Sequence, residues 1–62
     1  MLKQGKVIKF DKFVGYIKDK DNNEYLFLDY DLEEPINIGD LVTFKSEKFN
    51  DKYRAFSIKK IK

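Results

Sequence analysis

Apolar and polar residues alternate along several short segments of the chain, and residues that favour turns separate these segments about every 8–12 positions. The segments are rich in β-branched and aromatic residues, and no long helical pattern lies between them. We therefore predict five strands, at Lys3–Phe10, Phe13–Lys18, Tyr25–Leu28, Leu41–Ser46 and Tyr53–Ile61. The intervening segments are a tight bend at Asp11–Lys12, polar turns at Lys18–Glu24 and Glu47–Lys52, and a connection at Asp29–Asp40.

Five short strands in 62 residues predict a small barrel, because closure removes the exposed edges that a flat five-stranded sheet would carry. The expected fold class is all-β, a five-stranded antiparallel OB-type β-barrel, with an SH3-like small barrel as the alternative. A chain of this length forms one domain, residues 1–62. Folding buries only about 60% of the unfolded surface at this size. Six Phe and four Tyr supply large side chains for the small core.

The alternation assigns opposite faces to neighbouring residues of the second and third predicted strands. One face, which we predict to point into the core, carries Phe13, Gly15, Ile17, Tyr25 and Phe27. The outer face carries Val14, Tyr16, Lys18, Leu26 and Leu28. The alternative is the inverted assignment, in which the apolar residues of the second set form the core. Other predicted core residues are Val7 and Phe10, brought to one side by a bend or bulge, together with Val42, Phe44, Ala55, Ile58 and Ile61.

Charge is segregated along the chain, although the net charge is only +2. Residues 1–18 hold five lysines and one acid, residues 19–40 hold eight acids and one lysine, and residues 41–62 hold seven basic residues and two acids. This distribution predicts a basic and an acidic region on the folded protein. We interpret the last four residues, Lys59–Lys62, as a frayed basic end.

The absence of Cys and His from the sequence removes disulfides, thiolate–zinc sites, Cys nucleophiles and the usual general base. No convergent pair of carboxylates is evident either, so we expect neither enzymatic activity nor a cofactor. The stretch Asp19–Glu24 places oxygen atoms at alternate positions, as calcium loops do, but lacks the glycine and the full length of such loops, and no metal site is expected.

The chain has no run of about 20 apolar residues, and its first ten residues lack the apolar segment of a signal peptide, so we expect a cytoplasmic protein.

Five short motifs, taken in order, resemble the cold-shock domain, a family of five-stranded OB barrels that bind single-stranded nucleic acid. The motifs are Gly5-Lys6-Val7-Ile8-Lys9-Phe10, Lys12-Phe13-Val14-Gly15-Tyr16-Ile17, Glu24-Tyr25-Leu26-Phe27-Leu28 followed by Tyr30-Asp31-Leu32, Gly39-Asp40-Leu41-Val42-Thr43-Phe44, and Ala55-Phe56-Ser57-Ile58. Each motif alone is degenerate. Their order and spacing carry the resemblance, which covers nearly the whole chain.

The chain departs from the family on the outer face, where the family presents stacking aromatics and a His. Here Lys9 stands for Trp, Val14 and Tyr16 for two Phe, Leu26 for a further Phe, and Leu28 for His. Only Tyr16 keeps a ring at these positions, and Val and Leu offer apolar contact without a π-face.

The resemblance implies binding of single-stranded RNA or DNA with low sequence specificity. Tyr16 would stack on a base, while Val14, Leu26 and Leu28 would make apolar contacts. Phosphates would be held by Lys6, Lys9, Lys12, Lys18 and Arg54. Lys45, Lys48 and Lys52 would extend this basic track, and Tyr53 and Phe49 would supply further rings. The alternative is a small protein–protein interaction module, with a protein partner or a homodimer formed through the face of Val14, Tyr16, Leu26 and Leu28.

Overall fold

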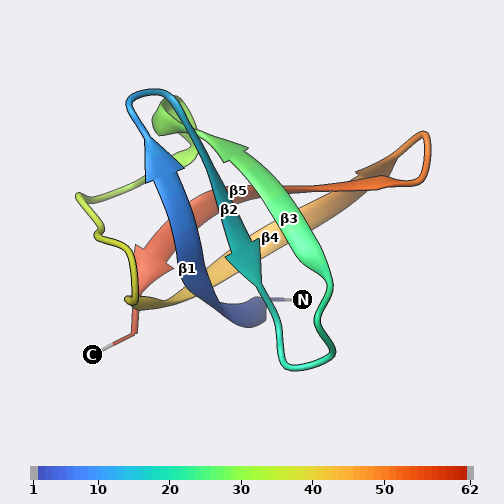
Figure 1. Ribbon diagram of the computed structural model, residues 1–62, viewed down its shortest axis with the longest axis horizontal. Coiled ribbons are helices and arrows are strands. Elements are labelled where there is room, and N and C mark those ends of the chain that lie inside the picture. Colours follow the sequence, from blue (N-terminus) through green and yellow to red (C-terminus); the bar gives the residue numbers. More distant parts are fainter. Residues whose placement is uncertain (1, 62) are drawn as a thin grey trace.

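The computed structural model describes residues 2–61, in which the predicted alternation produces five strands and one short 3-10 helix (Figure 1). The elements are β1 (Lys3–Asp11), β2 (Val14–Lys18), β3 (Glu24–Leu28), the 3-10 helix η1 (Asp29–Asp31), β4 (Leu41–Phe49) and β5 (Lys52–Lys60). The five predicted strands are confirmed, but β4 is longer than expected. The predicted turn at Glu47–Lys52 is therefore wrong, because only Asn50 and Asp51 form the turn. Met1 and Lys62 lie outside the described residues.

The strands close into a barrel in the order β1-β2-β3-β5-β4, and β4 pairs back onto β1. Because β5 lies between β3 and β4, the order is of the Greek-key type found in OB barrels, and the predicted all-β barrel is confirmed. The pairing is antiparallel except between β3 and β5, which run parallel. A parallel pair needs a crossover connection, and here η1, the following connection and β4 provide it. No helix among residues 2–61 is long and apolar enough to cross a membrane.

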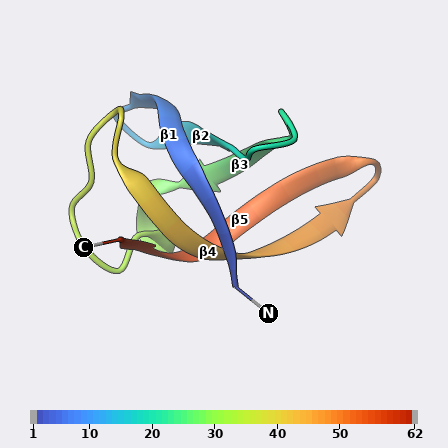
Figure 2. The ribbon, with the colours of Figure 1, turned by 90° about the horizontal axis from the view of Figure 1, so that it is seen from below.

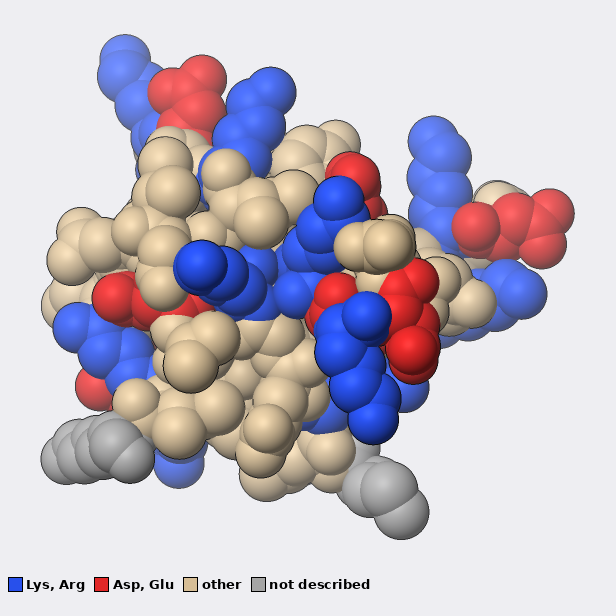
Figure 3. Space-filling model, turned by 60° about the horizontal axis from the view of Figure 1, so that its bottom comes forward, with Lys and Arg blue, Asp and Glu red and all other residues tan. Residues whose placement is uncertain are grey.

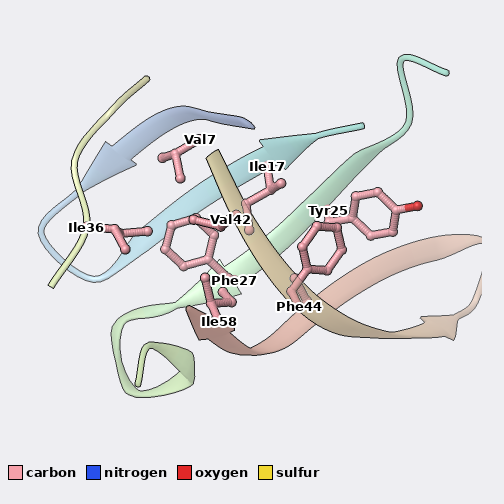
Figure 4. Packing of buried hydrophobic residues seen from close by; sticks show 9 residues of the cluster. Val7, Ile17, Tyr25, Phe27, Ile36, Val42, Phe44 and Ile58 are labelled. Atoms are coloured by element: carbon pink, nitrogen blue, oxygen red, sulfur yellow. The ribbon is translucent and has the colours of Figure 1, made fainter. Parts of the chain in front are cut away.

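The core lies inside the barrel and receives side chains from all five strands (Figure 4). The ring of Tyr25 meets that of Phe44 edge-on, with 4.9 Å between the centroids. The buried residues are Val7, Ile17, Tyr25, Phe27, Ile36, Val42, Phe44, Ala55 and Ile58. Ile36 comes from the connection after η1 and was not predicted. The inward assignment of alternate residues in β2 and β3 is thus confirmed, except at Phe13.

The predicted bulge in β1 is also confirmed. Val7 pairs with Ile17, but the next pair is Lys9 with Tyr16, so Ile8 is the extra residue. This shift lets Val7 and Phe10 turn to the same side, where Val7 is buried and Phe10 packs 5.4 Å from the ring of Phe27.

Phe13 and Ile61 were predicted to be core residues, and both predictions are wrong. Phe13 lies in the two-residue turn between β1 and β2, and 64% of its surface is exposed. The first inward position of β2 is instead Gly15, which leaves room for the Phe27 ring, since a Cβ added there would lie 2.3 Å from that ring. Ile61 follows the last residue of β5 and is exposed, while Ile36 supplies the additional buried side chain.

The hairpin of β4 and β5 extends beyond the barrel as a two-stranded arm (Figures 1 and 2). At its root, Thr43 pairs with Lys59 and Lys45 with Phe56, which leaves Ser57 as an extra residue of β5. Ser57 has a φ of +53°, a conformation that costs an L-residue other than Gly about 1–2 kcal/mol. This bulge re-aims the hairpin away from the barrel.

Candidate nucleic-acid interface

The outer faces of β2 and β3 form an apolar surface that we call the outer platform: Val14, Tyr16, Leu26 and Leu28. Val14 pairs with Leu28 and Tyr16 with Leu26, so the four side chains are cross-strand neighbours. Val14 is exposed and the other three are half-buried, whereas the alternate residues of both strands are buried. The inverted assignment of faces is therefore wrong.

The pairing registers also align residues across four strands. Lys9 of β1 pairs with Tyr16, Tyr16 pairs with Leu26, and Leu26 pairs with Arg54 of β5. Register partners lie on the same face of a sheet, and neighbouring strands are about 4.8 Å apart. We call these four residues the cross-sheet row. It places the ring of Tyr16 and the aliphatic side chain of Leu26 between the two cations Lys9 and Arg54, and it spans about 14 Å from the first strand to the last.

Arg54 is held in place by two residues of η1. Its Nη2 atom lies 3.3 Å from Oδ2 of Asp31 and 3.3 Å from the hydroxyl oxygen of Tyr30, and its guanidinium carbon lies 5.9 Å from the centre of the Tyr30 ring. The Asp31 side chain is only 8% exposed and also accepts a hydrogen bond from the backbone N–H of Leu28, at 2.8 Å. The charge of Arg54 is thus partly neutralised by Asp31, and the ion pair fixes the orientation of the guanidinium group.

Tyr30 was not predicted as part of the interface, yet this residue is 73% exposed and its ring lies beside Arg54. It adds a second accessible ring next to the cross-sheet row. Phe13, directly before β2, adds a third ring at the same end of the platform as η1, where its carbonyl accepts a hydrogen bond from the N–H of Asp29, at 2.9 Å. Sequence reasoning missed Tyr30 because nothing in the Asp29–Asp40 connection indicates that η1 folds back onto β5.

The predicted lysines of the first hairpin lie along one side of the platform. Lys6 and Lys18 are direct cross-strand partners at one end, Lys9 pairs with Tyr16 in the middle, and Lys12 occupies the turn with a φ of +39°. None of these four lysines forms an ion pair with a residue in the range 2–61. They are consequently available to anions.

Lysines at the end of β5 are placed differently. Lys59 pairs with Glu33 at 3.4 Å, Lys60 with Asp40 at 3.9 Å, and the N–H of Lys60 donates to Glu34 at 3.0 Å. The acidic connection therefore neutralises this end of the strand. The interpretation of Lys59 and Lys60 as a frayed end is wrong, and Lys62 lies outside the described residues.

Tyr53 does not join the outer platform. It precedes Arg54 in β5 and so lies on the opposite side of the strand, with its ring 5.3 Å from that of buried Tyr25. The ammonium of Lys48 lies 5.7 Å from the centre of the Tyr53 ring and 3.9 Å from Asp51. Of the predicted extension, Lys45, Lys52 and Phe49 remain exposed on the projecting arm.

The turn between β2 and β3 is organised by Asp19. Its carboxylate accepts hydrogen bonds from the Tyr25 hydroxyl at 2.8 Å, from the backbone N–H groups of Asp21 and Asn23 at 2.9 Å, and from the Asn23 amide at 3.2 Å. Desolvation raises the pKa of Asp19, but these hydrogen bonds outweigh it and the pKa is lowered. Burial, followed by the hydrogen bond to Asp19, raises the pKa of Tyr25 to about 12.

Within the described residues no three Cys, His, Asp or Glu side chains group as a metal site requires.

Figure 3 shows the lower end of the barrel, where basic and acidic side chains surround an uncharged area. Basic and acidic side chains are intermixed on the face that this view shows. Comparison of the sequence with protein-family models and with curated proteins finds no match.

Proposed function

We propose that the protein binds single-stranded RNA or DNA with low sequence specificity, as a divergent relative of cold-shock domains. The observation that carries the proposal is the cross-sheet row, in which Tyr16 and Leu26 lie between Lys9 and Arg54 on a partly exposed face. A platform of stacking and apolar groups beside backbone-binding cations is the arrangement by which OB folds hold single strands.

Each part of the platform has a role in this mechanism. Tyr16 stacks on one base, a contact worth about 1–3 kcal/mol. Leu26, Val14 and Leu28 contact neighbouring bases through dispersion and burial, without reading their edges. Tyr30, beside Arg54, offers a second ring. Lys6, Lys9, Lys12 and Lys18 neutralise phosphates, which carry no sequence information. Low specificity follows, since most contacts address base faces and the backbone.

A salt titration tests the proposal. The anisotropy of a labelled oligonucleotide of about 12 nucleotides, within the range of OB site sizes, is measured against protein at several salt concentrations. We expect log K to fall linearly with log salt, with a slope near 0.7 for each phosphate contacted. Lys9→Gln should lower the slope by about that amount, whereas the control Lys59→Gln, which removes an ion-paired lysine, should leave it unchanged. Failure to bind at low salt would refute the proposal.

The exposed apolar residues favour a second candidate function, a protein-contact surface or homodimer interface. Phe13 and Val14 are exposed at the end of the platform, and contiguous apolar groups of this kind mark interaction sites. Sedimentation equilibrium distinguishes the two. Self-association that Phe13→Ser and Leu28→Ser abolish, together with no oligonucleotide binding, would establish this second function in place of the first.

We further propose that the protein acts by binding without catalysis and that it is cytoplasmic. The sequence supplies neither His nor Cys for acid–base or nucleophilic chemistry. The location follows from the proposed ligand, since single-stranded RNA and DNA are encountered inside the cell.

A further inference from the structure

A pocket of about 630 Å³ opens at the lower end of the barrel, between the start of β1 and the turn that joins β2 to β3. Figure 2 views the barrel from this end, and Figure 3 shows charged groups around an uncharged area there. Its volume lies in the range typical of small-ligand sites, roughly 300–1,000 Å³. It is separate from the middle of the outer platform but shares Lys6 and Lys18 with the predicted interface.

Apolar side chains from three distant parts of the chain line this pocket. Leu2 precedes β1, Leu41 begins β4 and Ile61 follows β5, and the N–H of Ile61 donates to the carbonyl of Leu41 at 2.9 Å. Leu2 and Leu41 are each 56% exposed. Such side chains suit the flat face of a base or the carbon edge of a sugar, which bury apolar area without requiring a hydrogen bond.

Four lysines also line the pocket: Lys3, Lys6, Lys18 and Lys20. None of them forms an ion pair with any residue that the structure describes. The two acids of the lining are Asp19 and Asp21, and the carboxylate of Asp19 is already occupied by four hydrogen bonds from within the protein. Positive charge therefore predominates, and the pocket favours an anion.

Lys6 and Lys18 strengthen this conclusion. They are direct register partners in β1 and β2, and like charges at such positions are destabilising. On its other side Lys18 has Glu24 of β3 as its register partner, and the two do not form an ion pair among the described residues. An anion between the two ammonium groups would remove that repulsion. Lys18 also lies two residues from Tyr16 on the same face of β2, so an anion held here would be continuous with a strand lying on the outer platform.

We propose that this pocket receives the phosphorylated end of a single strand, with the terminal phosphate against the lysines and the terminal base or sugar against Leu2, Leu41 and Ile61. This inference rests on the proposed function and adds a preference for strand ends. A terminal phosphomonoester carries about −1.5 to −2 charges at neutral pH, whereas a phosphodiester within the strand carries one. A cluster of four unpaired lysines therefore attracts the terminal phosphomonoester more strongly than a phosphodiester within the strand.

The test compares four forms of one oligonucleotide that carries its label on an internal base: a 5′-phosphate, a 3′-phosphate, hydroxyls at both ends, and a closed circle. At low salt we expect one phosphorylated form to bind about tenfold more tightly than the hydroxyl-ended and circular forms. Lys20→Gln should reduce this preference severalfold and leave the affinity for the circle nearly unchanged. The matched control is Lys59→Gln, which removes a lysine that is paired with Glu33 and should retain the preference.

Equal affinity for all four forms would overturn the end-binding inference and leave the proposed function standing. A preference that survives in Lys20→Gln and in the double variant Lys3→Gln/Lys20→Gln would equally overturn it, because the preference would then arise elsewhere. Absence of binding by every form at low salt would instead refute the proposed function itself.

Discussion

The two faces of β2 and β3 are built from alternate residues of the same ten positions, yet they differ in what holds their side chains. On the inner face, Ile17, Tyr25 and Phe27 are at most 1% exposed and meet side chains from the other strands. On the outer platform, Tyr16 and Leu26 have comparable apolar character but are only half-buried, as cross-strand neighbours on the open side of the sheet. Apolar character alone therefore does not distinguish the core residues from those of the outer platform.

The two faces differ in how closely their side chains fit against neighbouring residues. The Phe27 ring fits against Gly15 so closely that no Cβ could be added there, and Tyr25 packs between Phe44 and Tyr53. Among the described residues, nothing comparable covers the outer platform. We expect changes to the inner face to alter stability, and changes to the outer face to alter binding while the fold persists.

Truncation of a large apolar side chain should lower the free energy of unfolding most on the inner face and much less on the outer platform. Phe27→Ala should lower the free energy of unfolding by about 3–5 kcal/mol, because it leaves a cavity in the core. Leu26→Ala, one residue away on the outer platform, should cost about 1 kcal/mol or less, since a half-buried side chain loses little burial. Urea denaturation monitored by circular dichroism measures both. Equal losses would mean that the outer face is packed like a core.

The hydroxyl of Tyr25 predicts a pH dependence specific to the inner face. Its pKa in the folded protein is about 12, against an ordinary value of 10.0. The protonated form is favoured by folding, so this contribution is complete below pH 10 and is lost as the pH rises to about 12. The lowered pKa of Asp19 acts in the opposite direction, and its contribution is lost as the pH falls below the ordinary value of 3.8.

Tyr25→Phe provides the control for this prediction, because it keeps the ring and removes the hydroxyl that donates to Asp19. Thermal unfolding across the alkaline range should show a smaller loss of stability in the variant than in the parent protein. An unchanged alkaline profile would contradict the raised pKa of Tyr25 in the folded protein.

Gly15→Ala should destabilise the barrel by about 1–3 kcal/mol, because the new methyl group would overlap the Phe27 ring and the carbonyl oxygen of Lys9. The neighbouring change Val14→Ala, on the outer platform, should cost less. The midpoints of urea denaturation rank the two variants. If Gly15→Ala were the milder change, the close contact between β2 and β3 would not be a constraint on folding.

The smallest expected effect is a gain. Ser57→Gly should stabilise the protein by about 0.5–1 kcal/mol, because Gly tolerates the positive φ of the bulge that Ser adopts with strain. Ser46→Gly, in β4 and without a positive φ, should instead destabilise by a similar amount. Melting temperatures of the two variants should therefore move in opposite directions, and a common loss would contradict the strain assigned to Ser57.

Much of the barrel follows from local pattern. Period-two alternation predicts the strands and the inner positions of β2 and β3. The conflict between Val7 and Phe10 predicts a bend or bulge in β1, which the structure places at Ile8. Phe13 was wrongly predicted to be a core residue, because the alternation of apolar and polar residues does not show where a turn ends and a strand begins. Phe13 belongs to the two-residue turn and not to β2, while the Phe10 and Phe27 rings pack against each other at 5.4 Å.

The interface was less accessible to sequence reasoning, because its electrostatics depend on long-range contacts. Arg54 and Asp31 are 23 residues apart, and no local signal indicates that they form an ion pair. The parallel pairing of β3 with β5 also decides which of Tyr53 and Arg54 faces outward. In contrast, the outer positions of β2 and β3 were predicted correctly, because both strands belong to one local hairpin.

The proposed function depends most on Tyr16, whose half-buried ring we propose to stack on a base. The most direct measurement is the affinity of Tyr16→Leu and Tyr16→Phe for one labelled oligonucleotide at low salt, with the unfolding free energy of each variant measured in parallel. We predict that Tyr16→Leu weakens binding by roughly 5- to 150-fold, the equivalent of about 1–3 kcal/mol, while Tyr16→Phe binds nearly as the parent does. Both variants should keep the stability of the parent to within about 1 kcal/mol. Unchanged affinity in Tyr16→Leu, or loss of the fold in that variant, would contradict base stacking by Tyr16 on the outer face.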